Sequence, residues 1–341
     1  MRGMMRLAAL GAVLTIGAGT DGALAQMTFS SMAPPNHPLN KQVFEPWAEQ
    51  IAKATGGRVN IRLLAKPAAA PNQVYDAIAS GQADVAFAPH SYQPDRFLPY
   101  LVAELPFLGD KAEHTSVAYW RVHKALLEKT GIHDKVVLLG LMTHGPGMFH
   151  HARKPMLAPE DLRGQKMRVG GDIPAAMVAH FHGVPITQPA PKSYEILSQG
   201  IADGILFPLE SVTGFNLTRV VPHTTYVKGG IYNLGFWVAM NKAAFEKLSA
   251  EDRQAIWKLS GESFARFAGA AWDRFDARAL EAIRANKNTY QEVSPALAAE
   301  LRKLTTKFEA DYVAKMAKFG VDGRAVIDAF RGEIAKLATS N

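Results

Sequence analysis

The chain has 341 residues, 48% hydrophobic and 20% charged, with 38 basic and 31 acidic residues and a net charge of +7. This composition favours a folded chain of about two domains over a disordered one. The sequence has no cysteine, which excludes disulfides, thiolate catalysis and cysteine-ligated metals. Its basic residues form no block with interleaved aromatics, which argues against nucleic acid as a partner.

The N-terminus has the pattern of a secretory signal peptide. Two arginines precede an apolar run over 7–16, and Ala23 and Ala25 supply small residues at the −3 and −1 positions. The apolar run is shorter than the roughly 20 residues that a membrane-spanning helix needs. We therefore expect residues 1–25 to be removed after Ala25 and the mature protein to be exported without a lipid anchor.

The rest of the chain predicts alternating strands and helices, which is typical of the α/β class. Predicted strands cover 27–33, 59–64, 136–142, 166–169 and 184–187, and predicted helices cover 40–55, 112–129 and 173–181. After two short β-like runs within 226–241 the chain is helical, over 243–248, 250–288, 297–319 and 323–339. The 250–288 segment keeps no heptad, so we expect one long helix packed across the molecule rather than a coiled coil.

One sequence pattern occurs twice, from Tyr75 to Asp84 and from Tyr194 to Asp203. Each copy predicts a helix, a glycine stop and a short buried strand, and each strand runs into a proline, Pro89 or Pro208. Two copies of one unit favour two similar α/β lobes with a cleft between them, and clefts bind small molecules. The alternative is chance similarity between two amphipathic helix ends.

Arg168 stands at the C-terminal end of the predicted strand 166–169, next to Gly170 and Gly171. Ligands of open α/β sheets bind beyond such strand ends. A guanidinium there holds a carboxylate through two parallel hydrogen bonds. The alternative is a surface arginine in an ordinary salt bridge.

Other chemistry has little support in the sequence. The neighbouring histidines at 150–151 and at 180 and 182 are badly spaced for one metal and lack a patterned carboxylate, so we expect neither a metal nor a cofactor. No phosphate-binding glycine loop and no G-x-S-x-G motif is present. Aromatic residues near predicted strand ends line either a pocket or the ordinary core: Tyr92, Phe149, Phe207, Tyr232, Phe236 and Trp237.

Six short motifs follow one another in a specific order and spacing. They are Pro34 to Pro38, Thr55 to Val59, Gly81 to Asp84, Glu104 to Phe107, Asp161 to Val169 and Gly200 to Gly204. On these motifs, nearly the whole mature chain resembles the solute receptors of tripartite ATP-independent periplasmic (TRAP) transporters, the dicarboxylate-receptor-like family. The resemblance implies a two-lobed periplasmic-binding-protein fold, in which each lobe is a mixed sheet flanked by helices and a long helix spans both lobes.

The resemblance also implies a function and a division of the chain. It implies a monomeric periplasmic receptor, not an enzyme, that encloses an organic acid between its lobes. The receptor then passes the acid to small and large membrane subunits driven by an ion gradient. We place lobe I in 26–145 and 234–275, and lobe II in 146–233 and 276–341.

The resemblance assigns a role to Arg168, because the matching arginine of the family pairs with the ligand carboxylate. Met148 stands where many sialic-acid-type members carry a second arginine, and Phe207 stands where an asparagine is frequent. We therefore hypothesise a monocarboxylate with an apolar or aromatic body contacted by Met148 and Phe207, with His90 and Tyr92 adding polar contacts from the other lobe. The predicted ligand-binding set also includes Phe149, Tyr232 and Trp237.

Two other functions stay open at this point. A secreted α/β enzyme acting on organic acids would show turnover, whereas a receptor shows saturable binding and no product. A receptor for an ATP-driven importer, or a sensor, would differ in its neighbouring membrane-subunit genes.

Overall fold

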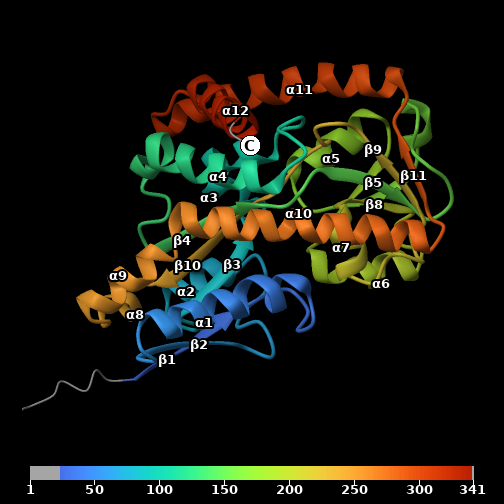
Figure 1. Ribbon diagram of the computed structural model, residues 1–341. Coiled ribbons are helices and arrows are strands. Elements are labelled where there is room, and N and C mark those ends of the chain that lie inside the picture. The colour runs from blue at the N-terminus through green and yellow to red at the C-terminus, as the bar shows by residue number, and fades with distance from the viewer. Residues whose placement is uncertain (1–23, 340–341) are drawn as a thin grey trace, which may run out of the picture.

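The computed structural model describes residues 24–339, which form two β-sheets surrounded by helices (Figure 1). The predicted signal peptide, except for its last two residues, lies outside the described residues. The first sheet has the order β2-β1-β3-β10-β4 and the second the order β11-β9-β5-β8-β6-β7. The strands of the first sheet are β1 (Ala25–Ser30), β2 (Val59–Leu63), β3 (Val85–Pro89), β4 (Val136–Thr143) and β10 (Gly235–Asn241). The strands of the second sheet are β5 (Gly147–His151), β6 (Lys166–Val169), β7 (Val184–Thr187), β8 (Gly204–Pro208), β9 (His223–Tyr226) and β11 (Thr289–Glu292).

Both sheets are mixed. In the first, β1 is parallel to β2 and β3, while β10 is antiparallel to β3 and β4. In the second, β6 is parallel to β7 and β8, β9 is parallel to β11, and β5 is antiparallel to β8 and β9. The chain crosses from the first sheet to the second between β4 and β5 and returns between β9 and β10.

Helices cover both sheets. The α-helices are α1 (Glu45–Ala54), α2 (Val74–Ala79), α3 (Pro94–Phe97), α4 (Ala112–Val122), α5 (Asp172–His180), α6 (Ser193–Ser198), α7 (Leu209–Gly214), α8 (Lys242–Glu246), α9 (Ala250–Lys258), α10 (Gly261–Ala285), α11 (Pro295–Met316) and α12 (Gly323–Thr339). Shorter 3₁₀ and π turns are η1 (Asn40–Phe44), η2 (His90–Tyr92), η3 (Leu98–Glu104), η4 (His123–Leu127), η5 (Glu128–Thr130), η6 (Pro159–Leu162), η7 (Ala190–Lys192) and η8 (Ala317–Phe319).

The long helix α10 joins the two parts of the molecule (Figure 1). It packs against α4 and β4 beside the first sheet, and against α7 and β11 beside the second. This arrangement confirms the predicted fold class, with a mixed sheet and its helices in each lobe and one helix across both. The exact lobe boundaries stay our proposal. The C-terminal helix α12, which we place in lobe II, packs against α4 and η3, which we place in lobe I.

The predicted helix over 250–288 is wrong in its continuity, because the structure divides it into α9 and α10. Ser260 is extended, with φ −110° and ψ −173°, and Gly261 takes a left-handed φ of +63°. A Cβ at Gly261 would lie 2.9 Å from the Trp120 ring, so glycine suits both the conformation and the close approach. The strand β11 occupies 289–292, just past the end of this predicted helix, and pairs with β9.

The two copies of the repeated pattern have the same structure. The first forms α2 and β3, and the second forms α6 and β8. In each copy the final aspartate accepts a backbone hydrogen bond from another strand of its sheet. Asp84 accepts from Thr28 N at 2.8 Å, and Asp203 accepts from Lys166 N at 2.9 Å. The aspartate at the equivalent position of each copy therefore connects the repeat unit to its sheet.

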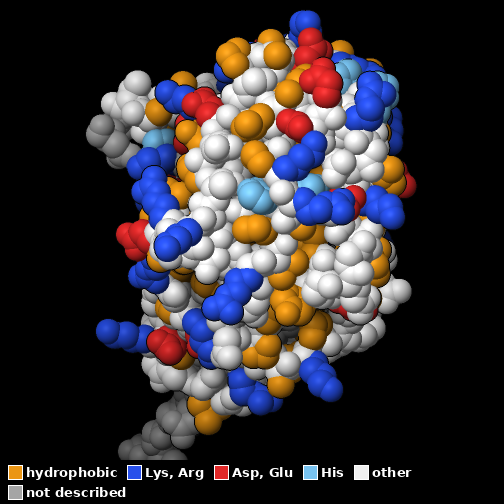
Figure 2. Space-filling view, turned by 90° about the vertical axis from the view of Figure 1, so that its right-hand side faces the viewer, with side chains coloured by type: hydrophobic (Ala, Val, Ile, Leu, Met, Phe, Trp, Pro, Cys, Tyr) orange, Lys and Arg blue, Asp and Glu red, His pale blue; other side chains and the backbone are white. Residues whose placement is uncertain are grey.

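The surface is mixed in charge. On the face shown in Figure 2, Lys and Arg side chains are scattered among acidic, apolar and uncharged ones. Within residues 24–339 no helix combines the length and the apolar character needed to cross a membrane.

Candidate functional site

The ends of strands from both sheets meet around one small enclosed cavity. Pro89 at the end of β3 and Phe207 and Pro208 at the end of β8 line it, so the two repeat units both lead into it. The free volume is about 40 Å³, which corresponds to roughly three water molecules. The aromatic lining residues are Phe87, Tyr92, Phe207, Phe215, Phe236 and Trp272.

Arg168 contributes the only Lys or Arg side chain among the described lining residues. It is 1% exposed, and both its Nε and its Nη2 donate to the backbone carbonyl of Gln188, the former at 2.9 Å. These bonds occupy the side edge of the planar guanidinium. The end edge, formed by Nη1 and Nη2, keeps two parallel N–H groups, the geometry that binds a carboxylate bidentately.

The surroundings of Arg168 are aromatic and phenolic. Its Cζ lies 4.7 Å from the centroid of the Phe207 ring, a cation–π contact in a desolvated place. Burial lowers the pKa of Arg168, and the nearby hydroxyls of Tyr92 and Tyr232 act in the opposite direction. An arginine stays protonated despite such a shift, so a buried positive charge faces the cavity.

Tyr92 links the two lobes at the edge of the cavity. Its hydroxyl accepts a hydrogen bond from Ala190 N at 2.9 Å, and η2 and η7 thereby come together. Burial raises the pKa of Tyr92, which keeps the phenol neutral. A neutral phenol beside Arg168 offers a further hydrogen bond to an anion held there.

A second contact between the lobes lies on the cavity wall. His37 Nε2 is 3.3 Å from Glu210 Oε1, and the side chains are 2% and 1% exposed. Leu39 N donates to His37 Nδ1, so the proton of the neutral imidazole is on Nε2. Burial lowers the pKa of His37 to about 4 and raises that of Glu210 to about 7. Both shifts favour the uncharged forms of these two side chains, which meet across the cleft, although His37 Nε2 and Glu210 Oε1 have no hydrogen-bond partner among the described residues.

The structure brings Arg168, Tyr92 and Phe207 of the predicted set to this cavity and places the other five elsewhere. His90 lies inside the first lobe, with its ring stacked on Tyr100 and its Nδ1 beside the Gly235 carbonyl. Trp237 packs edge-on against Tyr75. Ligand contact by His90 and Trp237 stays a prediction.

The remaining three belong to the second sheet and its connection. Met148 and Phe149 are adjacent on β5 and point to opposite faces; Phe149 is fully buried in the larger core, and Met148 lines a different pocket. Tyr232 donates its hydroxyl to the Leu206 carbonyl at 2.8 Å, beneath the cavity rather than in its lining. Their roles as ligand contacts likewise stay predictions.

Sequence reasoning missed several lining residues because their positions depend on tertiary structure. His144 lies in the turn after β4, His37 in the loop after β1, and Trp272 within α10. Only His37 had a local signal, since it sits in the motif from Pro34 to Pro38. For Trp272 the helical spacing indicates only a buried position.

The cavity opens toward a wider groove of about 770 Å³ between the lobes. Met32 and Ala33 line both, so the groove leads to the cavity. Its walls are rich in proline and alanine from the 63–71 segment and from the loop after β7.

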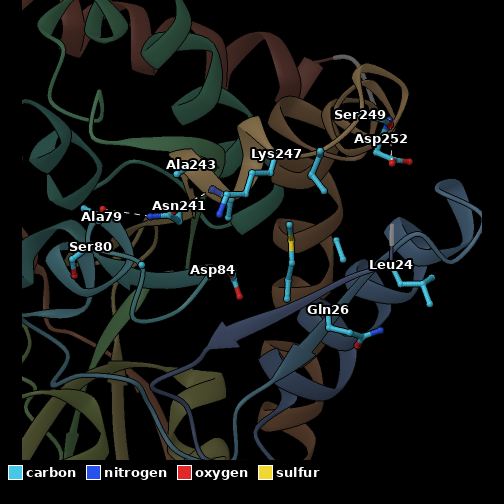
Figure 3. A pocket seen from close by; sticks show the side chains of 15 residues that line it. Leu24, Gln26, Ala79, Ser80, Asp84, Asn241, Ala243, Lys247, Ser249 and Asp252 are labelled. Atoms are coloured by element: carbon cyan, nitrogen blue, oxygen red, sulfur yellow. Dashed lines mark hydrogen bonds between the residues drawn. The ribbon is translucent and has the colours of Figure 1, made fainter. Parts of the chain in front are cut away.

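Another large pocket, of about 810 Å³, lies where β1 and β3 begin and β10 ends (Figure 3). Three of its polar side chains already have partners: Asp84 is bonded to Thr28, Asp252 to Arg58, and Asn241 to the Ile78 carbonyl. Two of its lining residues, at 24 and 25, belong to the predicted signal peptide. This pocket is therefore not our candidate.

The fold and the cavity define a class of protein: a two-lobed receptor that encloses a small anion between its lobes. Residues 29–316 match the family described as bacterial extracellular solute-binding protein, family 7 (DctP), and the chain belongs to this family. It is a TRAP solute receptor and not an enzyme, as the resemblance predicted. Members of this family are periplasmic.

Solved structures and a curated relative agree with this assignment. A TRAP periplasmic solute-binding protein from Bordetella bronchiseptica, solved with (R)- and (S)-mandelate, is 39% identical with a TM-score of 0.88, over 92% of this chain and 99% of that one. A TRAP solute-binding protein from Rhodoferax ferrireducens, solved with copurified benzoate, is 28% identical with a TM-score of 0.87, over 93% and 99%. A Comamonas testosteroni protein named outer membrane transporter protein TsaT is 27% identical over 310 residues, 91% of each chain.

Proposed function

We propose that this receptor captures an aromatic monocarboxylate in the periplasm and delivers it, as a monomer, to the small and large membrane subunits of a TRAP transporter. The observation that carries the proposal is one buried guanidinium, Arg168, in a cavity whose other lining residues are mainly aromatic and aliphatic. One cation matches one carboxylate, and the rings match an aromatic body.

The chemistry of the wall supports a single negative charge on the ligand. Besides Arg168, the lining contains His37 and His144, which burial keeps neutral, and burial raises the pKa of the neighbouring Glu210 to about 7. A second carboxylate would be desolvated there without a cation to compensate it, which is costly. The similar receptors from Bordetella and Rhodoferax, solved with mandelate and benzoate, point the same way.

A ligand of this size requires movement, because the free volume of the cavity is only about 40 Å³. The Tyr92–Ala190 and His37–Glu210 contacts join the lobes around it, so the cavity is the closed form of the cleft. We propose that the acid enters through the wider groove while the lobes are apart and is enclosed when they meet. Cleavage after Ala25 leaves β1 from Gln26 onward to pair with β2.

A thermal-shift screen of the purified mature protein tests the proposal. A ligand that binds only the native state raises the unfolding free energy by about 2.7 kcal/mol at a concentration of about 100 Kd. We expect benzoate and phenylacetate to raise Tm, and cyclohexanecarboxylate, the saturated match of benzoate, to raise it less. A larger shift with succinate, malate or a sugar acid than with any aromatic acid would contradict the proposal.

A further inference from the structure

Three buried polar atoms of side chains that line the cavity lack a hydrogen-bond partner among residues 24–339. They are Nε2 of His37, Nε2 of His144, in the turn after β4, and Nε1 of Trp272, on α10. His37 Nε2 lies 3.3 Å from Glu210, whereas His144 and Trp272, both 2% exposed, stand together on another part of the wall. An unpaired buried polar group costs about 1–3 kcal/mol, so such atoms call for an explanation.

The neighbourhood of His144 fixes which of its nitrogens carries the proton. Its Nδ1 lies 2.5 Å from the carbonyl oxygen of Gly145, and a carbonyl only accepts, so Nδ1 is the donor. Burial lowers the pKa of His144 to about 4, so the ring is neutral at physiological pH. Nε2 therefore presents a lone pair, an acceptor without a donor.

Other buried histidines of the described chain show how such a ring is satisfied by protein groups. His150 has both ring nitrogens occupied, by Thr224 Oγ1 at 3.0 Å and by the Phe207 carbonyl at 3.1 Å. In His90, Nδ1 lies 3.1 Å from the Gly235 carbonyl and Nε2 lies 3.2 Å from His133. His37 and His133 each keep one unpaired nitrogen, as His144 does, and of these three His37 and His144 line the cavity.

The indole of Trp272 supplies the complementary group. An indole N–H only donates, and its ring centroid lies 6.0 Å from that of His144. The two rings are therefore neighbours on the cavity wall, and one carries an unpaired acceptor and the other an unpaired donor. A hydroxyl group donates one hydrogen bond and accepts others, so a single hydroxyl satisfies both atoms. A carboxylate would repel the lone pair of His144, and an ammonium would offer nothing to Trp272.

We propose that His144 and Trp272 form a hydroxyl-recognition subsite, so that the receptor prefers hydroxylated aromatic acids to their unsubstituted parents. The inference rests on the proposed function, because Arg168 holds the carboxylate of the same ligand. Arg168 belongs to the second sheet, whereas His144 follows a strand of the first sheet and Trp272 belongs to the helix that joins them. The hydroxyl and the carboxylate of one ligand are thus read from different walls of the cavity.

Isothermal titration calorimetry with matched pairs of acids tests the subsite. The pairs are benzoate with 3- and 4-hydroxybenzoate, and phenylacetate with mandelate. We expect at least one hydroxylated acid to bind the wild type about tenfold tighter than its parent, the effect of about 1.4 kcal/mol. His144→Phe keeps a flat ring without the acceptor, and Trp272→Phe keeps a ring without the donor. Each is expected to lower the affinity ratio between the hydroxylated acid and its parent from about tenfold toward one, and this ratio, measured within each variant, is the readout.

The outcomes separate this inference from the function on which it rests. Hydroxylated acids that bind no tighter than their parents to the wild type would overturn the subsite while leaving the receptor function intact. If hydroxylated acids keep their affinity advantage in both His144→Phe and Trp272→Phe, and both variants are folded, the subsite is likewise overturned and the receptor function is not. If His144→Phe fails to fold, the wild-type pairs and Trp272→Phe decide. Failure of every aromatic acid to bind the wild type would refute the proposed function and this inference together.

Discussion

Replacement of Arg168 by alanine is expected to weaken binding of benzoate by about 10- to 150-fold. Two bonds to the Gln188 carbonyl hold one edge of the guanidinium, so its other edge is pre-oriented toward the cavity. A hydrogen bond between charged groups contributes about 1.5–3 kcal/mol. Since about 1.4 kcal/mol changes Kd tenfold, loss of that contribution gives the stated range.

The lysine variant of the same position separates charge from geometry. Arg168→Lys keeps the positive charge but loses the planar pair of N–H groups and the bonds that orient it. We expect its affinity to fall between those of wild type and alanine. Isothermal titration calorimetry with benzoate measures the affinities, and circular dichroism with thermal melting establishes that each variant is folded.

Arg163→Ala is the matched control, because Arg163 is an exposed arginine five positions earlier in the same motif. It removes the same net charge without touching the cavity, so benzoate affinity should stay within about twofold of wild type. Unchanged affinity in a folded Arg168→Ala variant would refute the assignment. An equal loss in Arg163→Ala would show that general charge attraction, not a bound carboxylate, causes the effect.

Two further variants test the aromatic wall and a buried carboxyl. Phe207→Leu removes the ring under Arg168 but keeps an apolar side chain, and we expect benzoate to bind about two- to tenfold more weakly; calorimetry showing equal affinity would contradict a role for this ring. Burial raises the pKa of Glu104 from 4.5 to about 8, so the native state retains a proton that the unfolded chain releases. The unfolding free energy should therefore fall by about 1.4 kcal/mol for each unit by which the pH rises between those pKa values. Glu104→Gln should remove this contribution to the dependence of the unfolding free energy on pH, measured by urea titrations at several pH values. An identical slope in the variant would argue against the buried acid.

The sequence predicts the strands that position Arg168 more accurately than it predicts the pocket around that residue. The polar and apolar alternation over 166–169 matches β6, and the glycine stops of both repeat copies match the ends of α2 and α6. These signals are local, because backbone conformation and side-chain alternation are set by near neighbours. The break between α9 and α10 depends instead on the distant Trp120 ring against Gly261.

Aromatic residues show why the pocket was harder to predict. Met148 pairs with Phe207 and Phe149 pairs with Leu206 across β5 and β8. Phe207 faces the cavity and Phe149 the core, yet both are buried aromatics near strand ends. Hydropathy cannot distinguish a ring that packs on protein from one that packs on a ligand. The difference appears only when the two lobes are brought together.

The two lobes are both anchored to one short stretch of α10, beside the cavity. Asp273 accepts backbone hydrogen bonds from Ala112 N at 2.7 Å and Glu113 N at 3.2 Å, at the start of α4 in the first lobe. Asp276, one turn further along, accepts from Glu210 N at 2.7 Å, in the first turn of α7 in the second lobe. Each carboxylate satisfies free N–H groups at a helix start, so each lobe has a fixed attachment to the helix.

Trp272 immediately precedes this pair of attachments and lines the cavity. Under our proposal, a ligand enclosed there touches the helix next to the point where both lobes are held, and it touches each lobe as well. The proposed site is complete only when the lobes are closed, because Tyr92, Arg168 and Trp272 line the cavity from the first lobe, the second lobe and the joining helix. Measured affinity then includes the free energy of closure, so a substitution at the Tyr92–Ala190 contact changes Kd without altering the carboxylate contact itself.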